Sequence, residues 1–193
     1  LIFSIAYEPF VGGAEVAVKE ITKRIPDIKF DMVTLNLNSR EKDFEQIGNV
    51  NVYRIHSSKN LFPINACRFA SKLHKKNSYN IVWSIMANYA GFASLFFKLR
   101  FNEVKFVLTL QEGATITEMK RRVRYIYPLF KQIFKKANLI QVISNYLYGF
   151  AKEMNSQAKI EIVPNGVDIG KFSSTQGSVI DKNKITLITT SRL

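Results

Sequence analysis

Two adjacent glycines stand between an apolar segment at the start of the chain and a helical pattern. Gly12 and Gly13 end the loop that begins at Tyr7. Glycines at the start of a helix let backbone N–H groups approach an anion at the positive end of the helix dipole, because no Cβ stands in the way. We therefore interpret Gly12 and Gly13 as a candidate site for a phosphate or a sugar. A tight turn from strand to helix requires the same glycines without any ligand.

A second candidate is an amphipathic pattern between residues 118 and 137. Its apolar side chains form one stripe, and the other side carries seven cations, which we call the basic surface: Lys120, Arg121, Arg122, Arg124, Lys131, Lys135 and Lys136. A helix that packs its stripe on the core and leaves its charges in water explains this pattern. The alternative is docking on anionic lipid headgroups, where each Lys or Arg contributes about 1 kcal/mol. Pro128 predicts a kink or two shorter helices.

The elements that must position these residues alternate along the chain. Short runs rich in Ile, Val and Phe predict strands at 1–6, 30–35, 50–55, 80–84, 105–110, 139–143 and 159–163. Helical spacing of apolar residues predicts helices near 14–25, 64–76, 89–99, 118–136 and 146–154. This alternation predicts an α/β fold, with a Rossmann-like parallel sheet and helices on both faces.

The composition predicts a globular chain with one main domain. The chain has 193 residues, 47% of them hydrophobic, which is enough to bury one core. Its single cysteine, Cys67, cannot form an intramolecular disulfide, which favours a reducing, cytoplasmic setting. With only two histidines beside it, we predict no metal site. Residues 77–97 lack charges, but their polar side chains favour a buried strand and a helix over a transmembrane span.

The composition changes after Phe172. The polar run SSTQGS at 173–178 is typical of a linker, and ITLITT at 185–190 predicts a further strand. We therefore predict one domain at 1–172, and at 173–193 a linker with the first strand of a second domain. This organisation is what a two-domain protein truncated early in its second domain would show.

Four short motifs, in order along the chain, resemble the retaining GT-B glycosyltransferases of the group 1 type. Pro9 and the GGAE run at 12–15 resemble the start of their N-terminal domain. The LIQVIS run at 139–144 resembles the penultimate strand of that domain. VPNGVD at 163–168 is the most specific run and resembles the interdomain junction, although its Asn-Gly pair is also a good turn. The terminal SRL at 191–193 resembles the opening of the donor domain.

The resemblance implies an enzyme that transfers a sugar from a nucleotide-diphosphate sugar to a glycan or lipid-linked acceptor, with retained anomeric configuration. It implies that this domain is one half of a GT-B fold and holds the acceptor, while Gly12 and Gly13 lie against the donor diphosphate. Arg192 would pair with that diphosphate, or else be a solvated terminal arginine. No metal or other cofactor is expected. Because the paired glutamates of this family belong to the missing domain, we expect the isolated chain to be inactive.

One segment departs from the family pattern. Where many members carry a histidine followed by an acidic residue, this chain has Gln111 and Glu112. Gln111 cannot titrate near neutral pH, so its expected role beside the donor sugar is positioning. Glu112 either binds acceptor hydroxyls or caps the following helix. Ser84 and Met86 stand where relatives often have histidines, so acceptor recognition cannot be copied from them.

The net charge of +13 favours anionic partners and leaves other functions open. A nucleic-acid module lacks support, because zinc-knuckle spacing, an aromatic RNP-type strand and a short helix-turn-helix unit are not found. A nicotinamide or flavin enzyme is disfavoured, because the glycine spacing lacks the third glycine of the dinucleotide fingerprint. A non-catalytic basic α/β module for anionic ligands remains the alternative to a transferase. Many relatives work on lipid-linked acceptors for cell envelope polysaccharides, so we expect a cytoplasmic enzyme with peripheral contact to the inner membrane face.

Overall fold

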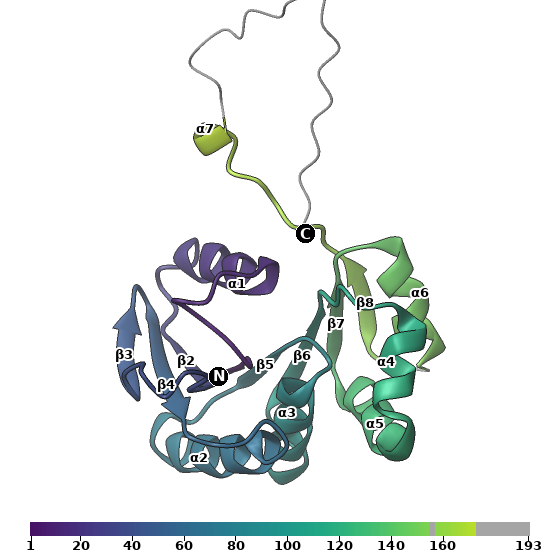
Figure 1. Cartoon of the computed structure of the whole chain (residues 1–193), viewed down its shortest axis with the longest axis horizontal. Coiled ribbons are helices and arrows are strands. Elements are labelled where there is room, and N and C mark those ends of the chain that lie inside the picture. Colours follow the sequence, from purple (N-terminus) through teal and green to yellow (C-terminus); the bar gives the residue numbers. More distant parts are fainter. Residues whose placement is uncertain (155–156, 173–193) are drawn as a thin grey trace, which may run out of the picture.

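The computed structural model describes residues 1–154 and 157–172, and it shows an α/β fold built on an eight-stranded sheet (Figure 1). The strand order is β3-β4-β2-β1-β5-β6-β7-β8, and all neighbours are parallel except β3 and β4. The strands are β1 (Ile2–Phe3), β2 (Phe30–Leu35), β3 (Phe44–Ile47), β4 (Val50–Ile55), β5 (Ile81–Ile85), β6 (Lys105–Leu110), β7 (Leu139–Val142) and β8 (Lys159–Ile162). The predicted fold class is confirmed.

Helices cover both faces of this sheet, but unequally (Figure 1). They are α1 (Gly13–Lys23), α2 (Phe62–Asn77), α3 (Tyr89–Arg100), α4 (Ile116–Arg122), the 3-10 turn η1 (Arg124–Ile126), α5 (Tyr127–Lys136), α6 (Asn145–Glu153) and α7 (Ile169–Phe172). Helix α1 packs on one face, and α2, α3, α5 and α6 share the core of the other face. Right-handed crossovers explain this division, because the chain moves in one direction along the sheet from β1 to β2 and in the opposite direction from β4 to β8.

Successive side chains of the short strand β1 point into the two hydrophobic cores on opposite faces of the sheet. Ile2 is fully buried under α1, together with Val18 of that helix. Phe3 is fully buried on the opposite face, where its ring meets Phe97 of α3 edge-on at a centroid distance of 6.0 Å. Side chains of a strand point to alternate faces, so β1 ties α1 to the larger helical layer.

Strand β3 and the helical segment around Pro128 differ from the predicted elements. Strand β3 was not predicted: it is an edge strand with alternately exposed residues, and it pairs antiparallel with β4 across a turn in which Gly48 has φ 60°. The helix predicted at 118–136 is divided into α4, η1 and α5, and Pro128 lies in the first turn of α5. Proline is accepted there because the N–H groups of the first turn have no partner within the helix.

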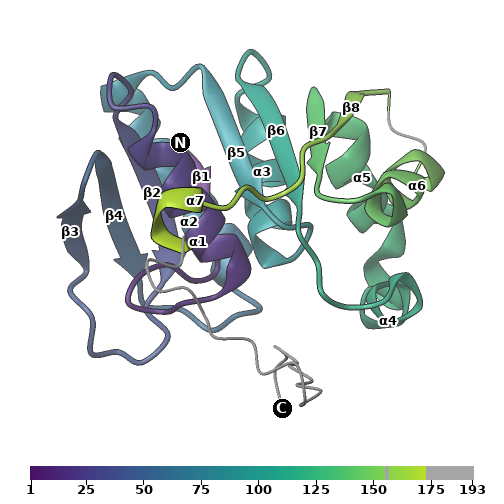
Figure 2. The same ribbon diagram turned by 90° about the horizontal axis from the view of Figure 1, so that it is seen from above.

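Residues 77–97 form the end of α2, then β5 and most of α3, so the prediction of a buried strand and a helix is confirmed. No helix in the described part of the chain is long and apolar enough to cross a membrane. After β8, the chain crosses to the α1 side, where Asp168 lies 3.5 Å from the guanidinium group of Arg24 (Figure 2). The predicted linker and strand at 173–193 lie outside the described residues.

Candidate functional site

The glycine pair lies at the N-terminus of α1, where the sequence analysis expects it. Gly12 is the N-cap residue with extended backbone, Gly13 is the first helical residue, and Gly13 is exposed. A Cβ added to Gly13 would meet no described atom within 4 Å apart from its chain neighbours and the backbone of its own helix, whereas one added to Gly12 would overlap the carboxylate of Glu15. The carboxylate of Glu15 therefore lies beside the positive end of the helix, at the place where an anion would also be favoured.

The loop between β1 and α1 is fixed by a buried cation. Arg54 of β4 is buried, and its Nη2 donates to the backbone oxygen of Glu8 at 2.6 Å. Its Nη1 donates to the backbone oxygen of Lys42 at 3.0 Å, and Nη2 also pairs with the carboxylate of Glu45. The side chain of Lys19 pairs with Glu8 from the helix side. Contacts with Arg54 and Lys19 therefore fix the loop that carries the two glycines.

Glu112 directly follows β6 and contacts the loop after β5. Its Oε1 accepts a hydrogen bond of 2.6 Å from the backbone N–H of Ala87. Its Oε2 is buried and has no hydrogen-bond partner among the described residues. Burial raises the pKa of the Glu112 carboxyl, although the backbone N–H groups of Ala87, Glu112 and Gln111 act against that rise. The alternative in which Glu112 caps the next helix is wrong, because Thr115 Oγ1 caps α4 and accepts a hydrogen bond of 3.2 Å from the N–H of Glu118.

The loop after β5 is itself held in an unusual conformation. Met86 has φ 69°, a left-handed backbone that a non-glycine residue seldom adopts, and its N–H donates to the backbone oxygen of Thr109 at 2.8 Å. Asn88 caps α3, accepting a 2.9 Å hydrogen bond from the N–H of Ala90. The hydrogen bonds of Met86 and Asn88 fix the backbone on both sides of Ala87, whose N–H group points toward Glu112. Strain of this kind is concentrated at binding and catalytic sites.

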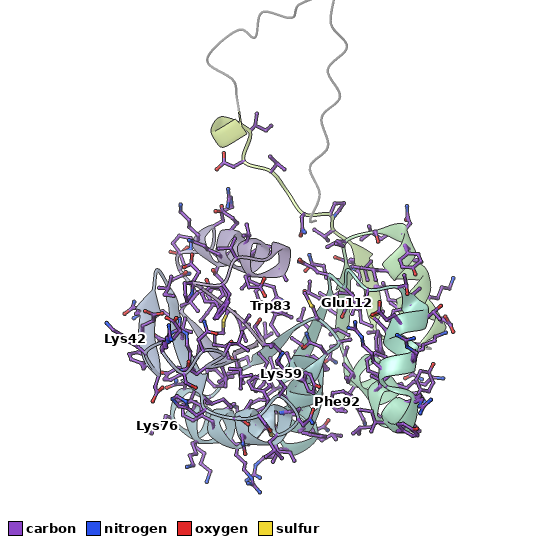
Figure 3. The ribbon with its side chains drawn as sticks, viewed as in Figure 1. Lys42, Lys59, Lys76, Trp83, Phe92 and Glu112 are labelled. Atoms are coloured by element: carbon purple, nitrogen blue, oxygen red, sulfur yellow. The ribbon has the colours of Figure 1, made fainter. Side chains whose placement is uncertain are left out.

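Glu112 lines a pocket of about 320 Å³ between α3 and the α4–α5 segment, which we call the Glu112 pocket. Its polar end is formed by Glu112, Asn88 and the backbone around Gly113. Its walls are apolar: Phe92, Met119, Val123, Ile126 and Phe130. Figure 3 shows Glu112 and Phe92 on the side of the molecule where α3 faces α4 and α5. The pocket walls could not be recognised in the sequence, because apolar side chains at helical spacing are also typical of a helix that packs on the core.

The glycine turn and the Glu112 pocket share one edge of the sheet. Strands β1, β5 and β6 are neighbours and parallel, so the loops that follow them emerge at the same carboxyl edge. Figure 2 shows the loop before α1 and helix α4 at this common edge. Ligands of open α/β sheets bind at the carboxyl ends of the strands.

The other predicted residues have mixed outcomes. Gln111 is partly buried beside Glu112 at the end of β6, and Arg192 lies outside the described residues. On the basic surface, Lys120 and Lys131 are partly exposed and the other five cations are exposed. Lys120 pairs with Glu153, and Arg122 pairs with Glu118 and also lines the Glu112 pocket. Within residues 1–154 and 157–172, no three His, Cys, Asp or Glu side chains are grouped as metal ligands would be.

Comparison with known proteins places this chain in a glycosyltransferase family. The family profile described as Glycosyltransferase Family 4 matches residues 11–171. An uncharacterized glycosyltransferase of Methanocaldococcus jannaschii is 31% identical over an alignment that covers 90% of this chain and 49% of the relative. The chain therefore spans about half the length of that curated relative.

Two solved structures have a similar fold. Sucrose-phosphate synthase from Thermosynechococcus elongatus superposes with a TM-score of 0.67 at 15% identity, covering 88% of this chain and 48% of that one. The Anabaena protein HepE, solved in complex with UDP and glucose, superposes with a TM-score of 0.62 at 14% identity, covering 90% and 46%. At these identities the likeness concerns the fold.

Proposed function

Because this chain belongs to glycosyltransferase family 4, we propose that it forms the acceptor-side domain of an enzyme that moves a sugar from a nucleotide diphosphate to an acceptor hydroxyl. One observation carries the proposal: a helix N-terminus with open space at Gly13 shares a sheet edge with a pocket in which one carboxylate oxygen, Glu112 Oε2, has no hydrogen-bond partner among the described residues. The first feature suits a diphosphate, and the second suits a hydroxyl group.

The donor diphosphate would lie against the first turn of α1. The N–H groups of a first helical turn have no partners within the helix, and the helix dipole favours negative charge there. Gly13 leaves room for close approach, while Glu15 would have to turn its carboxylate away. One structural neighbour was solved with UDP and glucose, which supports a nucleotide-linked hexose as the donor.

We assign the acceptor hydroxyl to Glu112 and the donor sugar to Gln111. Glu112 would accept a hydrogen bond from the acceptor hydroxyl, and Gln111 would position the donor sugar through its amide. In the retaining reaction that we propose, the acceptor oxygen bonds to the anomeric carbon as the bond to the diphosphate breaks. The acceptor proton passes to the departing phosphate oxygen. No protein base is needed, which is compatible with glutamine where many relatives have histidine.

The donor-binding domain would follow residue 172, with Arg192 neutralising the leaving diphosphate. We call the protein that carries this domain the two-domain protein. The test compares it with the 193-residue chain in a panel of UDP-, GDP- and ADP-sugars, scored for release of the nucleotide diphosphate. We expect release by the two-domain protein only. Turnover by the 193-residue chain alone would contradict the division of labour proposed here.

A second proposal concerns the basic surface. Tyr125 and Ile126 of η1 are 82% and 46% exposed, and the guanidinium carbon of Arg124 lies 4.3 Å from the ring centroid of Tyr125. Cations that surround exposed aromatic and aliphatic side chains suit the headgroup region of an anionic membrane. We propose peripheral binding of the enzyme at the cytoplasmic membrane face through this surface, where lipid-linked acceptors for cell envelope polysaccharides would be reached.

A further inference from the structure

The Glu112 pocket is lined mainly by apolar side chains, and it contains one buried carboxylate oxygen that lacks a hydrogen-bond donor among the described residues. Glu112 Oε1 accepts from Ala87, but Oε2 is buried and no donor in the described part of the chain reaches it. A buried unpaired carboxylate oxygen is costly, so it is expected where a ligand supplies the missing donor. A hydroxyl group is the simplest neutral ligand that can donate to it.

The walls of the pocket restrict what can carry that hydroxyl. Phe92 and Phe130 are buried and face the pocket from α3 and α5, and Met119 faces it from α4. These three side chains cannot pair with a sugar hydroxyl, so a bare monosaccharide could replace its hydrogen bonds to water only at the polar lining residues, Glu112, Asn88, Tyr89 and Arg122, and not along the walls. The volume of about 320 Å³ is far more than one hydroxyl needs, and hydrocarbon is the material that such walls favour.

The pocket also adjoins the exposed apolar side chains of η1. Ile126 lines the pocket and is 46% exposed, and Arg122 lines it from α4 as a member of the basic surface. A chain bound along the walls would therefore pass Ile126 toward solvent, close to the surface proposed to contact lipid.

We propose that the Glu112 pocket binds an amphiphilic acceptor, with a hydroxyl on Glu112 Oε2 and a hydrocarbon chain along Phe92, Met119, Val123, Ile126 and Phe130. This inference rests on the proposed function, because it names the acceptor class of the same site. The hydrocarbon part of the acceptor determines which acceptors bind, and the hydroxyl end is placed at the carboxyl edge of the sheet.

The test is a titration of the ¹⁵N-labelled 193-residue chain, followed by amide chemical shifts. The probes are octyl β-glucoside, below its micelle concentration, and methyl β-glucoside, which has the same sugar without the chain. We expect octyl β-glucoside to shift the amides of residues 86–92, 112–114 and 119–126, and methyl β-glucoside to leave them unchanged. Equal shifts with both probes, or octyl β-glucoside shifts spread over residues that do not line the pocket, would overturn the proposal.

Two variants test the contributions of the hydroxyl group and of the hydrocarbon chain to binding separately. Glu112→Gln keeps the side-chain volume, and we expect it to weaken octyl β-glucoside binding about tenfold, as the loss of a hydrogen bond to a charged group implies. Val123→Phe fills the apolar part and is expected to abolish binding. The matched controls, Glu103→Gln and Val16→Phe, change exposed residues outside the pocket and are expected to bind like the parent chain. Unchanged binding by both pocket variants would refute the assignment.

Failure of this inference is distinguishable from failure of the proposed function. If the two-domain protein transfers sugar to methyl and octyl glycosides with equal kcat/KM, the proposed function stands and the amphiphile assignment falls. If the 193-residue chain binds octyl β-glucoside as described but the two-domain protein uses no nucleotide sugar, the pocket stands and the transferase proposal falls.

Discussion

Replacing Gly13 by alanine separates two demands on the first residue of α1, the stability of the helix and room for a ligand. Gly13 is exposed, and beyond the local helix backbone an added Cβ would meet no atom of residues 1–154 or 157–172 within 4 Å. The folded chain therefore has no steric reason to resist Gly13→Ala. The same Cβ would project into the space from which we propose that a diphosphate approaches.

The two effects have opposite signs. Alanine in a helix is favoured over glycine by about 0.5 to 1 kcal/mol, so the free energy of unfolding should rise by up to that amount. If the methyl group pushes a phosphate oxygen out of hydrogen-bond reach, the loss is about 1.5 to 3 kcal/mol, or roughly 10- to 100-fold in kcat/KM for the nucleotide sugar. Stability and activity should change in opposite directions.

The assay combines urea unfolding of the 193-residue chain with donor kinetics of the two-domain protein. Gly149→Ala is the matched control, because Gly149 is exposed within α6 and its added Cβ would also meet nothing within 4 Å. We expect both variants to be stabilised and only Gly13→Ala to lose kcat/KM. If Gly13→Ala keeps the parent kcat/KM while being stabilised like the control, the N-terminus of α1 does not hold the donor diphosphate.

Three further outcomes follow from the structure. Because burial raises the pKa of the Glu112 carboxyl, the folded chain keeps this proton to higher pH than the unfolded chain does. The free energy of unfolding should therefore fall as pH rises from about 4 through the raised pKa. Glu112→Gln should flatten this fall, whereas Asp27→Asn, which changes an exposed carboxylate, should not. Parallel slopes for parent and Glu112→Gln in unfolding scans at several pH values would contradict this. Arg54→Met should lower the free energy of unfolding by about 2 to 4 kcal/mol, since it removes the donor of two backbone oxygens and of the partly exposed Glu45 carboxylate; a loss under 1 kcal/mol in urea would show that other contacts hold the loop before α1. The basic surface should make the chain co-sediment with phosphatidylglycerol vesicles and not with phosphatidylcholine vesicles; equally negligible binding to both would end the membrane proposal.

The central elements could be predicted from the sequence because of their burial. Strands β2, β4 and β6 begin and end at the predicted residues, since each carries buried apolar side chains between polar turns. Strand β3 could not be found in this way. Its four residues are half exposed, and it owes its conformation to pairing with β4 and to the contact of Phe44 with Tyr53 at 5.0 Å between ring centroids.

The candidate site was only partly predictable for a related reason. The glycine pair has a local signature, and its position at the start of α1 is confirmed, while its role as a ligand site stays a prediction. The hydrogen bond between Ala87 and Glu112 joins residues 25 apart in sequence, so no local sequence pattern predicts it. Val123 and Phe130 look like core residues of an amphipathic helix. Only the packing of α4 and α5 beside α3 shows that they also line a pocket.

The most direct test of the central claim is the product formed by the two-domain protein from a nucleotide sugar and an octyl glycoside. The anomeric configuration of the new bond is read by NMR, and the rate is compared between parent and Glu112→Gln. We predict a glycosylated product whose new bond keeps the anomeric configuration of the donor, formed at least tenfold more slowly by the variant. No product from any donor in the panel, an inverted anomeric centre, or equal rates for both proteins would contradict the account.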